Sequence, residues 1–397
     1  MIFLIVVFWF CLGAIFYSYL LYPMILFAIV RVPFIYRQRP KRLSTTSEIL
    51  SVSIVIAAYN EERVIRSKLI NSLSLDYPKD MLDVWVVSDG SSDKTNEIVM
   101  DYVNKYKRVH LIEVPRRGKA SALNEAMNCI KSDIVVFSDA NTEFSHDSIE
   151  KLLRHFGDPG VGCVSGRLIY RNPSGLISGK GESLYWRYET TLKRLESKLG
   201  YVAGANGAIY AIRRELFELL PNGTVNDDFM VSMTIVKKGF KSIYDEHALA
   251  YEDVSPSVGG EFKRHVRDGG GHYISVIRLL NLLNPFLGVR AFIYWSHRVL
   301  RWAGPFMLII TLIVNIWLLN AMPYKGIFML QLGFYVTALI GFLSLRTRKL
   351  PFFLYMPFYF CALNTALFIG FLRALTRRQT STWQSTERLL KESEKAF

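Results

Sequence analysis

Asp139 and Asn141 have the residue types and the spacing to hold a metal ion. They follow an apolar run at residues 134–137 and stand two positions apart, so both side chains project toward the same side of an extended turn. Hard cations such as Mg²⁺ or Mn²⁺ prefer oxygen ligands and are typically completed by substrate phosphates. Short Asp-x-Asn strings are also common in ordinary turns, so spacing alone leaves both a metal site and a plain turn open.

The adjacent carboxylates Asp227 and Asp228 are candidates for proton transfer. They follow Asn226 and open the stretch FMVSMTIVKKGF, which has a helical pattern. A positioned carboxylate with a suitable pKa can accept a proton from an attacking hydroxyl group. Carboxylates at a helix N-terminus are also stabilised by the helix dipole, so helix capping explains the same pair equally well.

Arg264 and Arg267 are three residues apart and share one face of a predicted helix, which Gly269-Gly270-Gly271 is expected to interrupt. Two guanidinium groups on one face can bind a diphosphate through paired hydrogen bonds. A solvated helix face is the simpler interpretation of the same spacing. The sequence pattern by itself does not exclude either.

A scaffold for these side chains is predicted by alternating strands and helices after residue 50. The apolar runs typical of buried parallel strands are 52–58, 84–87, 109–114 and 134–137. Helices are expected over 120–130 and from Ile65, with Asn60 as the cap of the latter. Repeated strand–helix units predict an α/β fold with a mostly parallel sheet.

Polar side chains cluster at the carboxyl ends of these strands, where ligands bind in open α/β sheets. The three segments are 57–61, 89–90 and 139–141. The first strand–helix turn has no GxGxxG string, which disfavours a dinucleotide site, and Arg117-Gly118-Lys119 lacks the upstream glycine of a P-loop. The chain also contains no GxSxG or HExxH string, so hydrolase classes are unsupported.

Residues 1–30 contain no charged side chain and predict a membrane-spanning helix, for which about 20 apolar residues are enough. A cleaved signal peptide is disfavoured because no Lys or Arg precedes Arg31. A basic cluster follows at Arg31, Arg37, Arg39, Lys41 and Arg42. Because basic residues beside a span stay in the cytoplasm, the next domain is expected in the cytosol. No aromatic-interleaved groove accompanies the cluster, so a nucleic-acid partner is not expected.

The predicted organisation has six parts. They are a transmembrane helix at 1–30, a basic linker at 31–49, a cytosolic α/β domain at 50–283, an amphipathic interface helix at 284–301, transmembrane or interfacial helices at 302–372, and a basic tail at 373–397. Basic residues flank both ends of the last apolar run, so the charge pattern does not decide whether this run crosses the membrane or lies in the interface. The tail that follows is expected in the cytosol.

The composition agrees with a polar domain joined to membrane segments. Of 397 residues, 51% are hydrophobic, yet 48 are Lys or Arg and 34 are Asp or Glu, giving a net charge of +14. This apolar content excludes a disordered chain. Four cysteines, none in a CxxC string, exclude a disulfide scaffold and support neither a zinc site nor a redox pair.

Seven strings, in this order, resemble the family 2 glycosyltransferases, in particular the membrane-embedded inverting synthases of cellulose, hyaluronan and poly-N-acetylglucosamine. They are IVIAAYNEE (54–62), VVSDGSSDKT (86–95), RGKASALNEAM (117–127), FSDAN (137–141), AGANGAIYAIRRELF (203–217), NDDFMVSMTIVKKGF (226–240) and RHVRD (264–268). The resemblance implies a GT-A-type, Rossmann-like catalytic domain that transfers a sugar from a nucleotide sugar with the help of Mg²⁺ or Mn²⁺.

The resemblance also implies a role for each matching position. The nucleotide-sugar site would contain Ala58, Asn60, Glu61, Asp89, Lys119 and Asp139. Asp139 and Asn141 would bind the metal, Asp228 would be the catalytic base, and Arg264 and Arg267 would offset charge on the diphosphate. The acceptor site would contain Gly204, Ala205, Asn206 and Asp227, with Trp383 of the tail as a further candidate.

Two positions depart from the family pattern. Asn141 replaces the second metal-binding Asp, which removes one negative charge, and Asp268 replaces the Trp that closes the last motif in processive synthases. The expected function is inverting hexosyl transfer at the cytosolic face of the plasma membrane, and the departure at Asp268 leaves processive synthesis open. The expected acceptor is a surface glycan, with export proteins as partners; a lipid-phosphate sugar or a short lipid-linked glycan is the alternative product.

Overall fold

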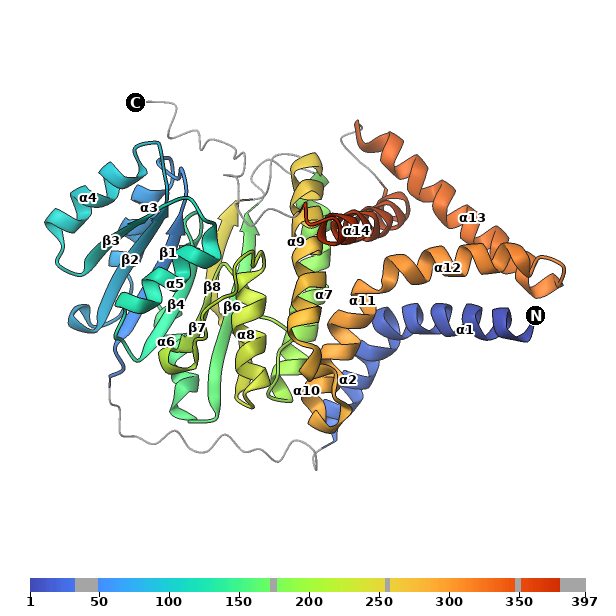
Figure 1. Ribbon diagram of the computed structural model, residues 1–397, viewed down its shortest axis with the longest axis horizontal. Helices are drawn as coiled ribbons and strands as arrows, with labels where there is room; N and C mark the ends of the chain where they lie inside the picture. The colour runs from blue at the N-terminus through green and yellow to red at the C-terminus, as the bar shows by residue number, and fades with distance from the viewer. Residues whose placement is uncertain (33–48, 172–176, 254–257, 347–350, 379–397) are drawn as a thin grey trace.

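The computed structural model describes residues 1–32, 49–171, 177–253, 258–346 and 351–378 (Figure 1). An eight-stranded sheet forms its centre, in the order β3-β2-β1-β4-β7-β6-β8-β5. The strands are β1 (Val52–Ala58), β2 (Leu82–Asp89), β3 (Val109–Val114), β4 (Ile134–Asp139), β5 (Glu143–Phe144), β6 (Val161–Arg171), β7 (Tyr210–Arg213) and β8 (Lys241–Asp253).

The predicted mostly parallel sheet is confirmed. β1 pairs in parallel with β2 on one side and with β4 on the other, and β2 pairs in parallel with β3. The mixed part begins at β7, which is antiparallel to both β4 and β6. The predicted strands 52–58 and 109–114 have the observed bounds, and the other two extend further, to Asp89 and Asp139.

Helices cover both faces of the sheet, which explains why the strands are apolar along their whole length. One face carries α3 (Ile65–Leu73), α4 (Thr95–Lys105) and α6 (Ser148–Leu153), and the other carries α5 (Lys119–Cys129) and α8 (Asp227–Lys237). Alternate residues of β1 point to opposite faces, so Ile54 packs with the first group and Val55 with the second.

Asn60 does not cap a helix, contrary to the sequence-based expectation. α3 begins only at Ile65, and Asn60 adopts a left-handed backbone conformation with φ +53°. Its Oδ1 accepts a hydrogen bond of 2.8 Å from the backbone N–H of Ser92, and its own N–H donates to Ser91 Oγ. Asn60 therefore joins the loop after β1 to the loop after β2.

The glycines after Arg267 do not interrupt the helix, which also differs from the expectation. α9 (Val258–Arg278) runs through Gly269, Gly270 and Gly271 and packs closely on α14 (Phe352–Leu375). A Cβ atom on Gly370 of α14 would lie 2.6 Å from the Gly270 nitrogen and 2.7 Å from the Val266 oxygen. Absence of side chains at this crossing lets the two helix backbones approach each other.

Among the described residues, three helical segments are long and apolar enough to cross a membrane: Ile2–Arg31, Met322–Leu343 and Phe352–Leu375. The first consists of α1 (Ile2–Phe16), a π-helical turn at Tyr17–Leu21 and α2 (Tyr22–Arg31). The others are α13 and α14. Val289–Trp302, which contains α10 (Val289–Ile293) and α11 (Leu300–Trp302), is bent by 57° from α12 (Gly304–Trp317), and this pair is a fourth span if it crosses as one.

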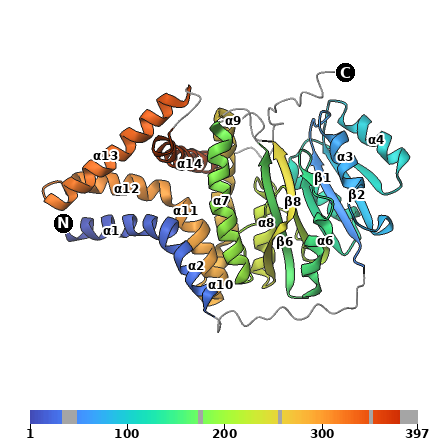
Figure 2. The ribbon, with the colours of Figure 1, turned by 180° about the vertical axis from the view of Figure 1, so that it is seen from behind.

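The predicted interface helix at 284–301 falls on the first arm of that bent pair, and most of the predicted basic linker and tail lies outside the described residues. In both views, α7 (Ile177–Lys198) and α9 stand between the sheet and the apolar helices (Figures 1 and 2). The buried cluster of Tyr22, Leu26, Leu192 and Leu195 joins α2 to α7. The α/β domain is thus packed directly against the candidate membrane segments.

Candidate active site

A cavity of about 710 Å³ begins at the carboxyl edge of the sheet and extends to α14. It starts where β1 has β2 on one side and β4 on the other, the topological switch point at which ligands bind in such sheets. The parallel register places Ala57 beside Asp139, so the ends of β1 and β4 are level. Both residues line the cavity.

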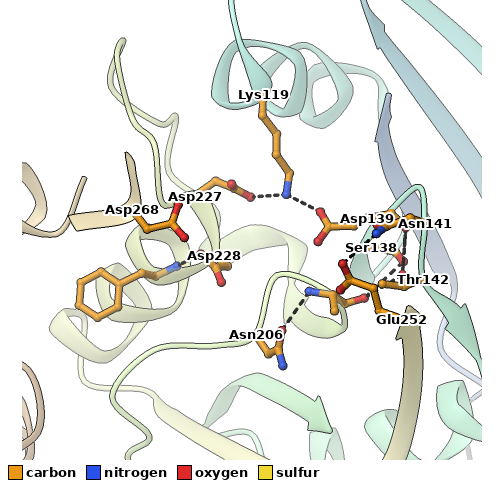
Figure 3. Close-up of polar contacts among 12 residues, drawn as sticks. Lys119, Ser138, Asp139, Asn141, Thr142, Asn206, Asp227, Asp228, Glu252 and Asp268 are labelled. Atoms are coloured by element: carbon orange, nitrogen blue, oxygen red, sulfur yellow. Dashed lines mark hydrogen bonds and ion pairs between the residues drawn. The ribbon is translucent and has the colours of Figure 1, made fainter. Parts of the chain in front are cut away.

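Lys119 lies at the centre of the polar part of this cavity (Figure 3). Its Nζ is 2.8 Å from Asp139 Oδ1 and 3.3 Å from Asp227 Oδ2. Burial alone would lower the pKa of this amine, but the charges of Asp139 and Asp227 outweigh burial and hold the pKa above its ordinary value. Lys119 is therefore a fixed positive charge between two carboxylates.

Asp228 faces the cavity beside this triad and has the properties of a general base. Burial, and then the neighbouring charge of Asp227, raise the pKa of Asp228 to about 6. Its Oδ1 accepts a 2.8 Å hydrogen bond from the Phe229 N–H at the start of α8. A Cβ atom on Gly207 would lie 3.3 Å from Asp228 Oδ2, so the glycine leaves room around the carboxylate.

Asp139 and Asn141 also line the cavity, and their oxygen atoms suit a divalent cation. Asn141 Nδ2 donates a 2.8 Å hydrogen bond to Glu252 Oε1 at the end of β8, so a third oxygen-bearing side chain is held beside the pair (Figure 3). Among the described residues no three His, Cys, Asp or Glu side chains are grouped as a metal site. The pair can supply two ligands, and Mg²⁺ or Mn²⁺ usually takes the remainder from phosphate and water.

Lys68 supports this turn and was not identified from the sequence. It is almost fully buried on α3, and its Nζ donates to Ser138 Oγ at 2.6 Å and to the Thr142 carbonyl at 2.9 Å. Ser138 and Thr142 are the two ends of the segment that carries Asp139 and Asn141, so the Lys68 amine binds this segment at both ends. Burial lowers the pKa of Lys68 to about 7. Nothing in the sequence around Lys68 distinguishes it from an ordinary surface lysine of a helix, so this contact could not be predicted.

Asp89, which is predicted to contact the nucleotide, is buried beneath the loop that leads to Lys119. It is 0% exposed, forms a 2.9 Å ion pair with Arg116 and accepts hydrogen bonds from the N–H groups of Arg117 and Gly118. Gly118 has φ +98°, a conformation that favours glycine. Asp89 thus orders the turn that begins α5 and positions Lys119 without lining the cavity itself.

The other predicted donor and acceptor residues divide into two groups. Glu61, Ala205, Asn206 and Asp227 line the cavity, whereas Ala58, Asn60 and Gly204 lie outside its lining. Gly204 is beneath it: a Cβ atom there would lie 2.7 Å from Phe229 Cδ2, and its φ is +100°. Trp383 lies outside the described residues.

Arg264 and Arg267 both line the cavity from α9, so the predicted shared face is turned toward the candidate site. Asp268 lines it too and forms a 3.3 Å ion pair with Arg267. The residue that departs from the family motif therefore contacts one of the two arginines. Of the residues predicted to bind the nucleotide sugar or to act in catalysis, Asp139, Asp228 and both arginines line one cavity, and Asp89 does not.

A second polar cluster lies between α7 and residues 294–302, and its members Glu189, His297 and Arg301 line the cavity. The sequence patterns did not reveal it. His297 lies 2.5 Å from Glu196 and 3.1 Å from Glu189, and Arg301 forms a 2.6 Å ion pair with Glu189. These side chains come from α7 and from residues 294–302, about 100 positions apart. Charges brought together over that distance leave no local motif.

Comparisons with known proteins agree with a GT-A-type domain that has a cavity at the carboxyl edge of its sheet. Residues 53–220 match the family model described as glycosyl transferase family 2. This region therefore resembles a family 2 glycosyltransferase domain, and the chain is similar to family 2 polysaccharide synthases.

Particular relatives make the likeness more specific. The chain is 27% identical over 237 residues to poly-β-1,6-N-acetyl-D-glucosamine synthase of Staphylococcus epidermidis, covering 58% of this chain and 57% of that protein. It is 28% identical over 233 residues to the synthase of the same name from Staphylococcus aureus, covering 57% of this chain and 56% of that protein. The chain thus matches little more than half the length of these relatives.

One solved structure shares the arrangement of nearly the whole chain. The mannosyltransferase PcManGT from Pyrobaculum calidifontis, solved in complex with GDP-Man and Mn²⁺, superposes with a TM-score of 0.68 at 22% identity. The superposition covers 94% of this chain and 99% of that one. The GT-A fold inferred from the sequence strings is therefore confirmed.

Proposed function

We propose that the protein is an inverting glycosyltransferase that moves a hexosyl group from a nucleotide sugar to an acceptor hydroxyl at the cytosolic face of the plasma membrane. The observation that carries this proposal is the single cavity into which Lys119, Asp139, Asp228, Arg264 and Arg267 all face. The cavity contains cations that can bind a diphosphate and a carboxylate with a raised pKa that can accept a proton. Sugar transfer from a nucleotide donor requires both.

The donor binds at the sheet edge in this proposal. Lys119, Arg264 and Arg267 would bind the diphosphate and offset the negative charge that grows on it as the sugar leaves. Asp139 and Asn141 would hold Mg²⁺ or Mn²⁺, which supplies further positive charge to the same oxygens. Lys68 and Asp89 would keep the two loops in place, because each binds backbone groups of a loop that carries a donor-binding residue.

Asp228 accepts the proton of the acceptor hydroxyl. The hydroxyl oxygen attacks the anomeric carbon from the side opposite the diphosphate and forms the new glycosidic bond. The bond from that carbon to the diphosphate oxygen breaks, and its electron pair leaves with the nucleoside diphosphate. With a pKa of about 6, Asp228 is ionised at neutral pH and ready to accept this proton.

A UDP-sugar is the expected donor, and a cell-surface polysaccharide is the expected destination. The similarity to poly-β-1,6-N-acetyl-D-glucosamine synthases supports the transfer of a sugar to a glycan. The GDP-Man in the similar solved structure supports a GDP-sugar as the competing donor. The three candidate spans support a multi-pass membrane protein, in which polysaccharide-export proteins would be the natural partners.

The test is an assay of membranes that contain the protein with a panel of radiolabelled UDP- and GDP-sugars. We expect one donor to release its nucleoside diphosphate and transfer label, and Asp228→Asn to bind that donor without transferring the sugar. Label of high molecular mass would indicate a polymer, and label extracted into organic solvent would indicate a lipid-linked product. Absence of release with every donor, from protein that is folded, would contradict the proposal.

A further inference from the structure

Lys193 is a buried cation that the proposed chemistry at the donor does not use. It lies on α7, is 4% exposed and lines the cavity. Its ammonium group forms no hydrogen bond or ion pair with any residue that the structure describes, and its nearest aromatic ring, that of Trp186, is centred 5.9 Å away. A buried charge without such a partner is costly, so this group is suited to binding an anion.

Charged groups of both signs surround Lys193: the cation Arg298 and the carboxylates Glu189, Asp228 and Glu196 all act on its charge. Arg298 also lines the cavity, donates a 2.7 Å hydrogen bond from Nε to the Ala203 carbonyl and lies 3.5 Å from Glu189. Glu189 is already shared with Arg301 and His297, so its charge is compensated without Lys193. Burial, and then the charge of Arg298, lower the pKa of Lys193 to about 8, which leaves the amine mainly protonated at neutral pH.

Lys193 lines the same cavity as Asp228, the proposed base. Its charge is close enough to Asp228 to lower the pKa of that carboxyl, in opposition to burial and Asp227. The donor diphosphate has its own proposed cations, namely Lys119, Arg264 and Arg267, which also line the cavity. Lys193 is therefore available to an anionic group on the molecule that presents the attacking hydroxyl.

Beyond Lys193 the cavity is lined by one face of α14. The lining residues are Phe352, Met356, Tyr359, Phe360, Leu363 and Leu367. Their spacing places them along one side of the helix. Tyr359 directs its hydroxyl to Glu261 at 3.0 Å, and Asn364, which also lines the cavity, donates to the Phe360 carbonyl of its own helix. This wall is mainly apolar, which suits a hydrocarbon chain better than a hydroxyl-rich glycan.

The apolar wall reaches the outside of the molecule within a candidate membrane span. α14 is one of the segments able to cross a membrane, and Phe352 and Met356 at its beginning are 65% and 38% exposed. An apolar chain could thus extend from the cavity along α14 while its polar end remains near Asp228. The apolar α14 face is continuous with the proposed active site, and Lys193 supplies a positive charge beside it. Together they favour an occupant that has both a hydrocarbon chain and an anionic group.

We propose that the acceptor is a lipid-linked phosphate: its phosphate group binds at Lys193, its hydrocarbon chain lies against the α14 face, and a hydroxyl of the sugar that it carries reaches Asp228. This inference rests on the proposed function and names its acceptor. The phosphate itself is not altered in the reaction. The hydroxyl loses its proton to Asp228 and gains the transferred sugar.

The binding experiment uses the full-length protein in detergent with a long-chain polyisoprenyl phosphate as probe, measured by native mass spectrometry. The matching polyisoprenol and inorganic phosphate are the comparison ligands. We expect the lipid phosphate to bind at least about tenfold more tightly than the alcohol, the effect of one charge-assisted hydrogen bond. Lys193→Gln should remove that difference and Lys193→Arg should keep most of it, whereas Lys237→Gln, at an exposed position of α8, should change nothing.

Equal binding of alcohol and lipid phosphate, or unchanged binding by Lys193→Gln, would overturn the proposal. Inorganic phosphate that binds as tightly as the lipid phosphate would overturn the lipid part of it. Nucleotide-sugar binding, measured on the same variants, separates the two proposals. A protein that binds no donor contradicts the glycosyltransferase, whereas donor binding together with Lys193-independent lipid binding contradicts only the acceptor.

Discussion

The two walls of the cavity differ in how their charges are balanced. The donor wall, formed by Lys119, Asp139, Asp227 and Asp228, places its cation between carboxylates at 2.8 and 3.3 Å. The acceptor wall, formed by Lys193, Arg298 and the α14 face, leaves Lys193 without an ion pair among the described residues. The donor wall is therefore held in place by its own contacts, whereas the acceptor wall has a charge that a ligand must satisfy.

This difference suggests that the walls respond differently to substitution. Removing a donor-wall residue breaks an interaction that exists before the ligand binds and so disturbs its neighbours. Removing Lys193 takes away an unpaired buried charge and should not destabilise the protein. Loss of chemistry without loss of stability is thus expected at the acceptor wall.

The largest effect is expected from Asp228→Asn. The amide cannot accept the hydroxyl proton, so the transfer rate should fall by about 10²–10⁴-fold, the usual contribution of a general base. Donor binding should persist because the cations of the donor wall remain. Asp101→Asn, at an exposed position of α4, is the matched control. A variant with wild-type turnover would show that Asp228 is not the base.

Asp139→Ala should have the next largest effect, on metal binding. It removes the carboxylate of the predicted Asp139–Asn141 pair, so affinity for Mn²⁺ in the presence of UDP should fall by at least about tenfold, measured by calorimetry. The variant also frees Lys119 from one partner, and its own thermal unfolding must be measured beside it. Unchanged Mn²⁺ binding in a folded variant would remove Asp139 from the metal site.

Gly370→Ala tests the connection between the cavity-lining arginines of α9 and the apolar helices. The new methyl group would lie 2.6 Å from the Gly270 nitrogen, so α9 and α14 must separate, at a cost typical of overpacking, about 1–3 kcal/mol. A lower midpoint of thermal unfolding and reduced transfer are both expected. Gly326→Ala on α13 is the control, because nothing lies within 4 Å of its Cβ position. Equal unfolding midpoints for the two variants would contradict the close helix packing.

The smallest effect is a shift in pH dependence. The pKa of Asp228 is about 6, so at lower pH this carboxyl is protonated and cannot act as a base. Transfer should therefore decline as the pH falls through about 6. The charge of Asp227 raises that pKa, so Asp227→Asn should lower it and move the acidic limb of the kcat/KM profile to lower pH. An acidic limb that stays in place or moves upward would show that Asp227 does not control the ionisation of Asp228.

The α/β part and much of the donor wall could be predicted because their signals are local. Apolar runs locate β1 and β3 at their observed bounds, and Asp139 directly ends β4. Two local inferences were wrong because tertiary contacts override local preference: Asn60 bonds to the loop after β2, and the glycines of α9 continue the helix because α14 packs against them.

Other residues could not be predicted because their partners are distant in sequence. Asp89 ends a strand of the sheet, a position where ligands often bind, yet the loop at Arg116–Gly118 covers it. Lys68 looks like an ordinary helix lysine until β4 places Ser138 against it. Whether such a side chain faces a ligand or a neighbouring loop depends on packing between segments, which no string of adjacent residues encodes.

By itself, the sequence determined the alternation of strands and helices, the apolar segments and the identity of the groups able to do chemistry. Periodicity and composition act through backbone hydrogen bonding and burial, which are properties of neighbouring residues. Only the tertiary structure decided which charges neutralise one another and which stay unpaired. Electrostatic energy depends on the distances between charged groups and on how deeply they are buried. Those distances and that burial are set only when helices 177–198 and 352–375 pack around one cavity.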